Sequence, residues 1–103
     1  MKLIDYFGLL ETASIVTGAG SGIGRACAVL LAHLGSAVCV VDRDADRAQG
    51  TITAIDESGG RAFTVVGDAR DASLAEEAAR ATQERYGRID LLVNNVGGMF
   101  AAS

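Results

Sequence analysis

Residues Thr17 to Gly24, reading T-G-A-G-S-G-I-G, lie between a short apolar run at 13–16 and a helix-like run at 23–34. A Gly-rich turn that leaves a strand and opens a helix brings free backbone N–H groups to the positive end of the helix dipole. In an α/β protein this is where a phosphate group is held. The stretch therefore indicates the fold class, and it is the first candidate for a cofactor-binding turn.

The spacing of the glycines distinguishes between phosphate-binding patterns. The common pattern G-x-G-x-x-G, started at Gly18, needs a glycine at position 23, where the chain has Ile23. The pattern that fits is T-G-x-x-x-G-x-G, carried by Thr17, Gly18, Gly22 and Gly24. Gly18 would let the chain turn off the strand, Gly22 would let the backbone approach a pyrophosphate, and Gly24 would let the helix pack close to the strand. We expect Ile23 to point into the core beneath the helix.

The chain alternates strand-like and helix-like runs. Apolar runs that end at Gly or Asp predict strands, and runs with apolar residues three and four apart predict helices. Without an internal repeat or a linker, this alternation is typical of a parallel sheet with right-handed crossovers. We predict one α/β domain over 1–103, a partial Rossmann-type sheet of about four strands in the order 3-2-1-4 with flanking helices, truncated relative to the complete fold. The predicted strands are 13–17, 37–41, 61–67 and 89–93, and the predicted helices are 22–34, 44–58 and 73–86.

Three local patterns within this chain give more specific expectations. An apolar stripe in the first helix predicts the side that faces the sheet. Ser73 and Glu76 read as a capping box at the start of the third helix. Residues 1–12 show no clear period, and we expect them to cover one end of the sheet. The stripe of the first helix consists of Ile23, Cys27, Leu30, Leu31 and Leu34.

The composition argues against several kinds of partner. The net charge is −4, and nine Lys and Arg residues are scattered among thirteen Asp and Glu residues, which argues against nucleic acid. Residues 1–11 contain no long apolar stretch, so we expect neither a signal peptide nor a membrane span, and a cytoplasmic protein. Cys27 and Cys39 have neither a metal-binding nor a C-x-x-C spacing, so we expect two buried, reduced thiols and no metal.

An acidic residue follows the second predicted strand. Asp42 lies eighteen residues after Gly24, where a βαβ unit brings the end of its second strand to an adenosine ribose. A carboxylate there accepts hydrogen bonds from both ribose hydroxyls and repels a 2′-phosphate, so Asp42 favours NAD over NADP. Two alternatives stay open. Asp42 could serve only to begin the turn Asp42-Arg43-Asp44, or Arg43 could place a guanidinium beside a phosphate.

Four features, in this order along the chain, resemble one protein family. The Gly-rich turn at 17–24, Asp42, Asp68 after the third strand, and the motif N-N-V-G at 94–97 are similar to the N-terminal half of the short-chain dehydrogenase/reductase family. The resemblance covers residues 13–98. It implies that the chain binds a dinucleotide cofactor at the ends of its strands.

The resemblance also implies a role for each residue of the predicted cofactor site. The glycine turn would line the pyrophosphate and adenosine side, and Asp42 would bind the ribose. Asp68 and the backbone that follows it would meet the adenine edge. Asn94 and Asn95 would tie the fourth strand to the first and border the ribose, while Gly97 would keep a side chain away from the cofactor. For the two asparagines a purely structural role stays open. The full predicted set is Gly18, Ser21, Gly22, Ile23, Gly24, Asp42, Arg43, Asp68, Ala69, Asn94, Asn95 and Gly97.

The chain does not contain the catalytic pattern that the resemblance implies. In the family, hydride transfer relies on a Tyr acidified by a Lys four residues later, with a Ser and an Asn nearby. Tyr6 and Tyr86 are followed four residues later by Leu10 and Asp90, and the only lysine is Lys2. A phenol with a pKa of about 10 and no cationic partner is a poor acid or base at neutral pH. We therefore expect no catalytic residues and an inactive chain.

Three functional hypotheses follow. The leading one is the N-terminal, NAD-binding portion of a short-chain dehydrogenase/reductase, whose complete members transfer hydride between NAD and an alcohol or carbonyl substrate. The second is a non-catalytic nucleotide-binding or regulatory protein. The third is a fragment that self-associates through an unpaired edge of its sheet. A methyltransferase-type Rossmann fold is disfavoured by the glycine spacing.

Overall fold

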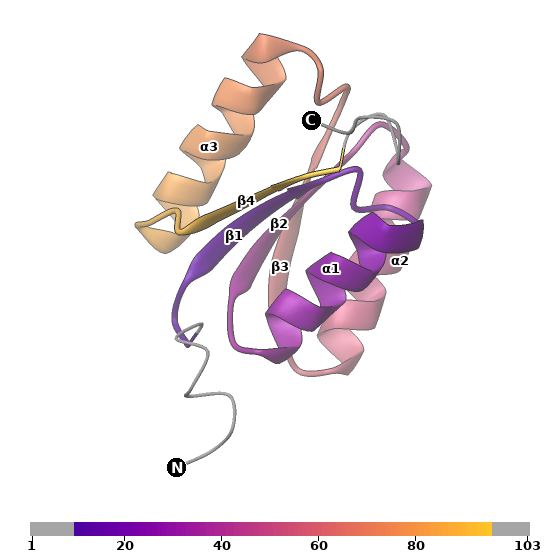
Figure 1. Ribbon diagram of the computed structural model, residues 1–103, viewed down its shortest axis with the longest axis vertical. Coiled ribbons are helices and arrows are strands. Elements are labelled where there is room, and N and C mark those ends of the chain that lie inside the picture. Colours follow the sequence, from indigo (N-terminus) through magenta and orange to yellow (C-terminus); the bar gives the residue numbers. More distant parts are fainter. Residues whose placement is uncertain (1–9, 96–103) are drawn as a thin grey trace.

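Four parallel strands and three helices make up residues 10–95, the part of the chain that the structure, a computed structural model, describes. The strands lie in the order β3-β2-β1-β4, and a helix follows each of the first three (Figure 1). The predicted α/β class and strand order are thereby confirmed, whereas most of the predicted cover at 1–12 lies outside the described residues. The elements are β1 (Ala13–Thr17), α1 (Gly22–His33), β2 (Ala37–Asp42), α2 (Ala45–Glu57), β3 (Arg61–Val66), α3 (Ala72–Tyr86) and β4 (Leu91–Asn94).

Helices cover both faces of the sheet, α1 and α2 on one face and α3 on the other (Figure 1). The two central strands, β1 and β2, are buried at every position, as expected for strands packed on both sides. Their side chains alternate between two clusters. Val16 and Val38 pack on the side of α1 and α2, whereas Ile15, Cys39 and Val41 pack on the side of α3. The core is therefore split into two layers by the sheet.

The buried side of α1 agrees only in part with the predicted stripe, of which Cys27 and Leu31 are half-buried and pack against the core. The buried residues are Gly24, Ala28 and Ala32, spaced four apart, whereas Ile23 is 67% exposed and Leu30 is 56% exposed. The expectation that Ile23 points into the core is wrong. Small side chains let the helix axis approach the sheet closely, so the helix turns its small side inward, and its largest apolar residues do not decide its orientation.

Acidic residues cap two of the helices. Asp44 precedes α2, and its carboxylate accepts a hydrogen bond from the Arg47 N–H at 3.0 Å. Asp71 precedes α3 and accepts one from the Ser73 N–H at 2.9 Å. The predicted capping box that starts at Ser73 is wrong, because α3 begins at Ala72 and the Asp71 carboxylate accepts the capping hydrogen bond from the Ser73 N–H.

The two cysteines are not bonded to each other, and they differ in burial. Cys39 is fully buried in β2, and Cys27 is half-buried in α1, so the predicted burial is correct for Cys39 alone. Burial raises the pKa of the Cys39 thiol to about 11, although a hydrogen bond with Thr82 and the charge of Arg85 oppose the shift.

Among residues 10–95, no helix has the length and apolar character that crossing a membrane requires.

Candidate cofactor-binding site

Two adjoining pockets lie at the carboxyl ends of the strands, and we call them together the strand-end pocket. They have volumes of about 130 and 350 Å³ and share Gly18, Asp42, Arg47 and Asn95. An edge where parallel strands end is the usual ligand site of open α/β sheets. The first pocket is also lined by Arg43, Gly67, Asp68, Ala69 and Arg70, and the second by Ser21, Gly22 and Ile23.

Nine of the twelve predicted site residues line this pocket, and two of the described ones do not. Gly24 lies beneath the turn, packed against the Gly18 carbonyl. Asn94 lines a separate apolar pocket of about 250 Å³ between α3 and the sheet. Gly97 lies outside the described residues. The structure therefore brings the predicted residues of several strand ends together in one pocket, whereas Gly24 and Asn94 lie beside it.

The Gly-rich turn is shaped by backbone angles that suit glycine. Gly18 has φ of 62° and Gly22 has φ of 57°, in the left-handed region. A Cβ added to Gly18 would lie 2.7 Å from the Asn95 carbonyl oxygen, whereas one added to Gly22 would meet nothing within 4 Å. Gly22 therefore presents bare backbone to open space at the start of α1. This arrangement fits a pyrophosphate, which needs close approach to backbone N–H groups.

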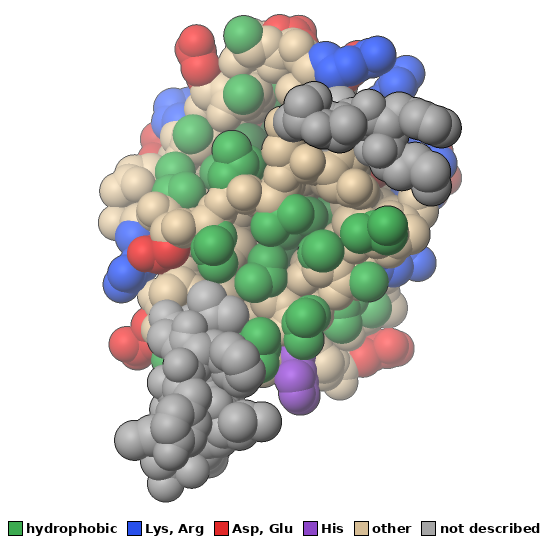
Figure 2. Space-filling model, in the orientation of Figure 1, with side chains coloured by type: hydrophobic (Ala, Val, Ile, Leu, Met, Phe, Trp, Pro, Cys, Tyr) green, Lys and Arg blue, Asp and Glu red, His purple; other side chains and the backbone are tan. Residues whose placement is uncertain are grey.

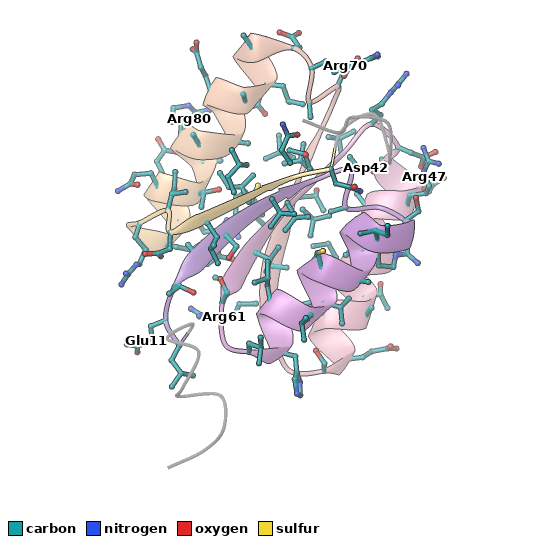
Figure 3. The ribbon with its side chains drawn as sticks, in the orientation of Figure 1. Glu11, Asp42, Arg47, Arg61, Arg70 and Arg80 are labelled. Atoms are coloured by element: carbon teal, nitrogen blue, oxygen red, sulfur yellow. The ribbon has the colours of Figure 1, made fainter. Side chains whose placement is uncertain are left out.

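Asp42, 8% exposed at the end of β2, is held by backbone donors. Its Oδ1 accepts a hydrogen bond from the Gly20 N–H at 3.0 Å, and its Oδ2 accepts one from the Asp44 N–H at 3.0 Å. The Arg47 Nε lies 3.7 Å from Oδ2 (Figure 3). A carboxylate accepts about four hydrogen bonds, so about two positions remain. Asp42 begins the turn, as the alternative proposed, and also faces the pocket.

The other side of the pocket carries an ion pair. Arg70 donates from Nε to Asp68 Oδ1 at 3.0 Å and from Nη2 to Oδ2 at 2.8 Å. These side-chain hydrogen bonds, joined by one from the Arg70 N–H, hold the pKa of the Asp68 carboxyl well below its usual range. Arg47 and Arg70 are not among the residues predicted from the sequence. Their place two or three residues after an aspartate is the local signal that could have found them.

Thr17 and the two asparagines join β4 to β1. The Thr17 hydroxyl donates to Asn94 Oδ1 at 2.9 Å and accepts from the Asn95 N–H at 2.9 Å. The Asn95 side-chain nitrogen lies 3.5 Å from the Gly18 carbonyl oxygen. The predicted tie between the first and fourth strands is thus present in the structure. It fixes Asn95 against the Gly-rich turn.

Tyr86, the one tyrosine among residues 10–95, lies far from this pocket. The Tyr86 ring packs against Phe63 at a centroid distance of 5.8 Å and lies 5.9 Å from the Arg61 Cζ. Arg61 begins β3 at the amino end of the sheet, opposite the end that carries Asp42 (Figure 3). Burial raises the pKa of Tyr86, which makes the phenol less acidic still.

Known proteins of one family are similar to this chain. A family model described as short chain dehydrogenase matches residues 12–103. The short-chain reductase protein NovJ of Streptomyces niveus is 45% identical over 87 residues, which are 84% of this chain and 33% of that protein. A crystal structure of hydroxysteroid dehydrogenase from Escherichia coli has a TM-score of 0.83 and 37% identity, covering 87% of this chain and 38% of that one. A short-chain dehydrogenase from Mycobacterium paratuberculosis, bound to NAD, has a TM-score of 0.81 and 26% identity, covering 86% of this chain and 38% of that one.

The similarity extends over nearly all of this chain but only part of its relatives. The chain spans about a third of the length of the curated relatives it matches. The matched part contains the Gly-rich turn and the four ordered strands at whose ends the strand-end pocket lies. The protein thus belongs to the short-chain dehydrogenase family, of which it represents the N-terminal portion.

Proposed function

We propose that this chain binds NAD in the strand-end pocket, as the cofactor-binding portion of a short-chain dehydrogenase. Proteins of this family use NAD or NADP as hydride carrier. The observation that carries the proposal is the convergence of Gly22, Asp42 and Asp68 on one pocket at the strand ends. Bare backbone at a helix start suits a pyrophosphate, and the two carboxylates can accept hydrogen bonds from a ribose and an adenine.

We propose NAD over NADP because of the position of Asp42. Its carboxylate is buried and held by two N–H groups, so it cannot swing away from a 2′-phosphate, and its charge is weakly screened. Arg43 also lines the pocket and would favour a phosphate. Its side chain is exposed to solvent, which weakens its effect relative to that of the buried carboxylate.

Titration calorimetry with NAD and with NADP tests this proposal. We expect NAD to bind at least about tenfold more tightly, since one repelled phosphate costs on the order of 1–2 kcal/mol at a partly screened site. Asp42→Asn keeps the size of the side chain and removes the charge, at the cost of one of its two backbone hydrogen bonds, so the preference for NAD over NADP should narrow. A folded chain that binds neither dinucleotide would refute the proposed function, and a preference for NADP would refute the role of Asp42.

We further propose that residues 1–103 alone do not oxidise alcohols. In a complete relative the reaction would be hydride transfer between NAD and an alcohol or carbonyl substrate. Here Tyr86 lies at the opposite end of the sheet from the pocket, and Asp90 stands four residues after it. The alternative is that the chain is a regulatory protein that binds the dinucleotide and catalyses no reaction. Robust alcohol-dependent reduction of NAD by the purified chain would contradict the proposal that the chain is inactive.

We also propose that the chain self-associates through β4. In the described residues β4 pairs with β1 alone, and Leu92 on this strand is 64% exposed. An unpaired strand edge with exposed apolar side chains is a template for pairing with another chain. The partner we propose is a second copy of this chain.

A further inference from the structure

Arg25 reaches behind the Gly-rich turn from the first turn of α1. Its Nη2 donates to the Gly20 carbonyl oxygen at 2.6 Å, and its Nε donates to Thr51 Oγ1 at 2.9 Å. The Thr51 hydroxyl, fully buried in α2, in turn donates to the Ala19 carbonyl oxygen at 2.7 Å. Two successive carbonyl groups of the turn are thus held by side chains from α1 and α2.

The Gly20 peptide is held from both sides. Its N–H donates to Asp42 Oδ1 at 3.0 Å, while the carbonyl oxygen of the same residue accepts from Arg25. A Cβ added to Gly20 would lie 2.6 Å from the Asp42 Cγ, so the turn and the carboxylate pack directly against each other. Arg25 therefore acts on the segment between Gly18 and Gly22, and through it on Asp42.

Gly50 provides the room for this guanidinium. A glycine inside a helix is less favourable than alanine, and Gly50 lies in the middle of α2. A Cβ added there would lie 2.6 Å from the Arg25 Nη2. The same nitrogen donates to the Arg47 carbonyl oxygen at 3.0 Å. The absence of a side chain at position 50 is thus what allows Arg25 to lie against the backbone of α2.

Arg25 also places a positive charge near the site. Within residues 10–95 no carboxylate forms an ion pair with Arg25, and its hydrogen-bond acceptors are two carbonyl groups and a hydroxyl. The side chain is half-buried, which reduces screening by solvent. Its charge therefore adds to the positive end of the α1 dipole next to the turn.

From this geometry we infer that Arg25 is a positioning residue for the dinucleotide, and that Gly50 is required for it. Arg25 holds the turn in the shape in which the backbone at Gly22 faces the pocket, and its charge favours the bound pyrophosphate. The inference rests on the proposed binding of a dinucleotide in the strand-end pocket. It extends the site to α2, which supplies no residue of the T-G-x-x-x-G-x-G motif.

Gly50→Ala tests the inference from a position that the cofactor does not reach. The new methyl group meets the tip of a flexible side chain, so the fold can keep its shape while the guanidinium moves away. Alanine also favours the helix. We expect the chain to stay folded, because the gain in helix propensity offsets part of the cost of the lost Arg25 hydrogen bonds, and NAD binding to weaken by roughly tenfold because the turn is no longer held in shape. The exposed Gln49→Ala in the same helix is the matched control and should leave NAD binding unchanged.

A double-mutant cycle shows whether Gly50 acts through Arg25. Arg25→Met should weaken NAD binding by a similar factor, and Gly50→Ala should have no further effect in the Arg25→Met protein. Arg25→Lys keeps the charge and loses the planar fork, so it should recover part of the affinity, and that part should shrink at high salt. Additive losses, or an unchanged affinity of Gly50→Ala, would overturn the inference.

Amide hydrogen exchange of the cofactor-free chain keeps this test separate from the proposed function. If the wild type binds no dinucleotide, the proposed function fails, but the Gly20 N–H still reports on the shape of the turn. Faster exchange of that N–H in both Gly50→Ala and Arg25→Met would support the positioning role. Exchange unchanged in both variants would refute it.

Discussion

The carboxylate of Asp42 holds the N–H groups of Gly20 and Asp44 and keeps acceptor capacity toward the strand-end pocket. The same atoms therefore shape the turn and would meet the ribose in the proposed complex. A substitution at this residue affects both, which is why Asp42→Asn, and not Asp42→Ala, is the informative change. The amide keeps one oxygen acceptor, so one of the two backbone hydrogen bonds is lost together with the charge, whereas alanine loses both.

Two glycines of the turn are expected to separate folding from binding. A Cβ at Gly24 would overlap the Gly18 carbonyl, a backbone group that has little room to move. We expect Gly24→Ala to lower the free energy of unfolding by about 2–3 kcal/mol, as at other overpacked sites. Gly22→Ala meets no neighbouring atom, and its positive φ costs about 1–2 kcal/mol, but it adds a methyl group to a residue that lines the strand-end pocket.

Urea denaturation and calorimetry together measure this pair of variants. Gly22→Ala should remain folded and bind NAD much more weakly, whereas Gly24→Ala should be mainly a stability defect. A Gly24→Ala protein as stable as the wild type would contradict the close packing of α1 against the turn.

At the scale of elements, α1 is oriented by its small residues. Gly24, Ala28 and Ala32 face the sheet, and Ala28 is fully buried in the cluster that includes Val16 and Val38. The exposed Leu30 lies on another side of the same helix. A close helix–sheet distance leaves no room for a larger side chain on the inner side.

This orientation predicts opposite effects for two substitutions in α1. Ala28→Leu should destabilise the fold by about 1–3 kcal/mol, because the added carbons must displace packed neighbours. Leu30→Ala should change stability by no more than about 0.5 kcal/mol, as is usual for exposed positions. Thermal or urea denaturation measures both. A large loss of stability for Leu30→Ala with none for Ala28→Leu would instead support the apolar stripe predicted from the sequence as the buried side of α1.

At the scale of the whole molecule, β4 leaves one edge of the sheet without a partner among the described residues. Hydrophobic side chains gather on the face that shows β4 and α1 (Figure 2). Leu30, Leu91 and Leu92 are 56%, 36% and 64% exposed.

Sedimentation velocity over a range of concentrations tests self-association through this edge. We expect the average mass to rise with concentration for the wild type. Leu92→Lys should shift the chain toward the monomer, because a charged side chain on an edge strand blocks pairing. Val66→Lys makes the same change on β3, at the other edge, where Val66 is 46% exposed, and should have little effect. A monomeric wild type at all concentrations would refute the proposal.

The amino-acid sequence by itself determined the order of elements and the end of the sheet at which we propose the cofactor site. Strand ends at Thr17 and Asp42 are local signals, because a buried apolar run stops at a Gly or an Asp whatever the rest of the fold does. The glycine spacing is equally local, and it led to the family. The helix ends were predicted to within a residue or two, apart from the capping of α3 by Asp71.

The tertiary structure alone decided which side of α1 is buried and which side chains support the turn. The rotation of α1 depends on contact between Gly24 and the Gly18 carbonyl, and Ile23 is left outside as a consequence. Arg25 gave no sequence signal because its partners, Gly20 and Thr51, come from different elements. Hydrogen bonds between segments distant in sequence depend on how helices pack on the sheet, and periodicity within one segment carries no information about that packing.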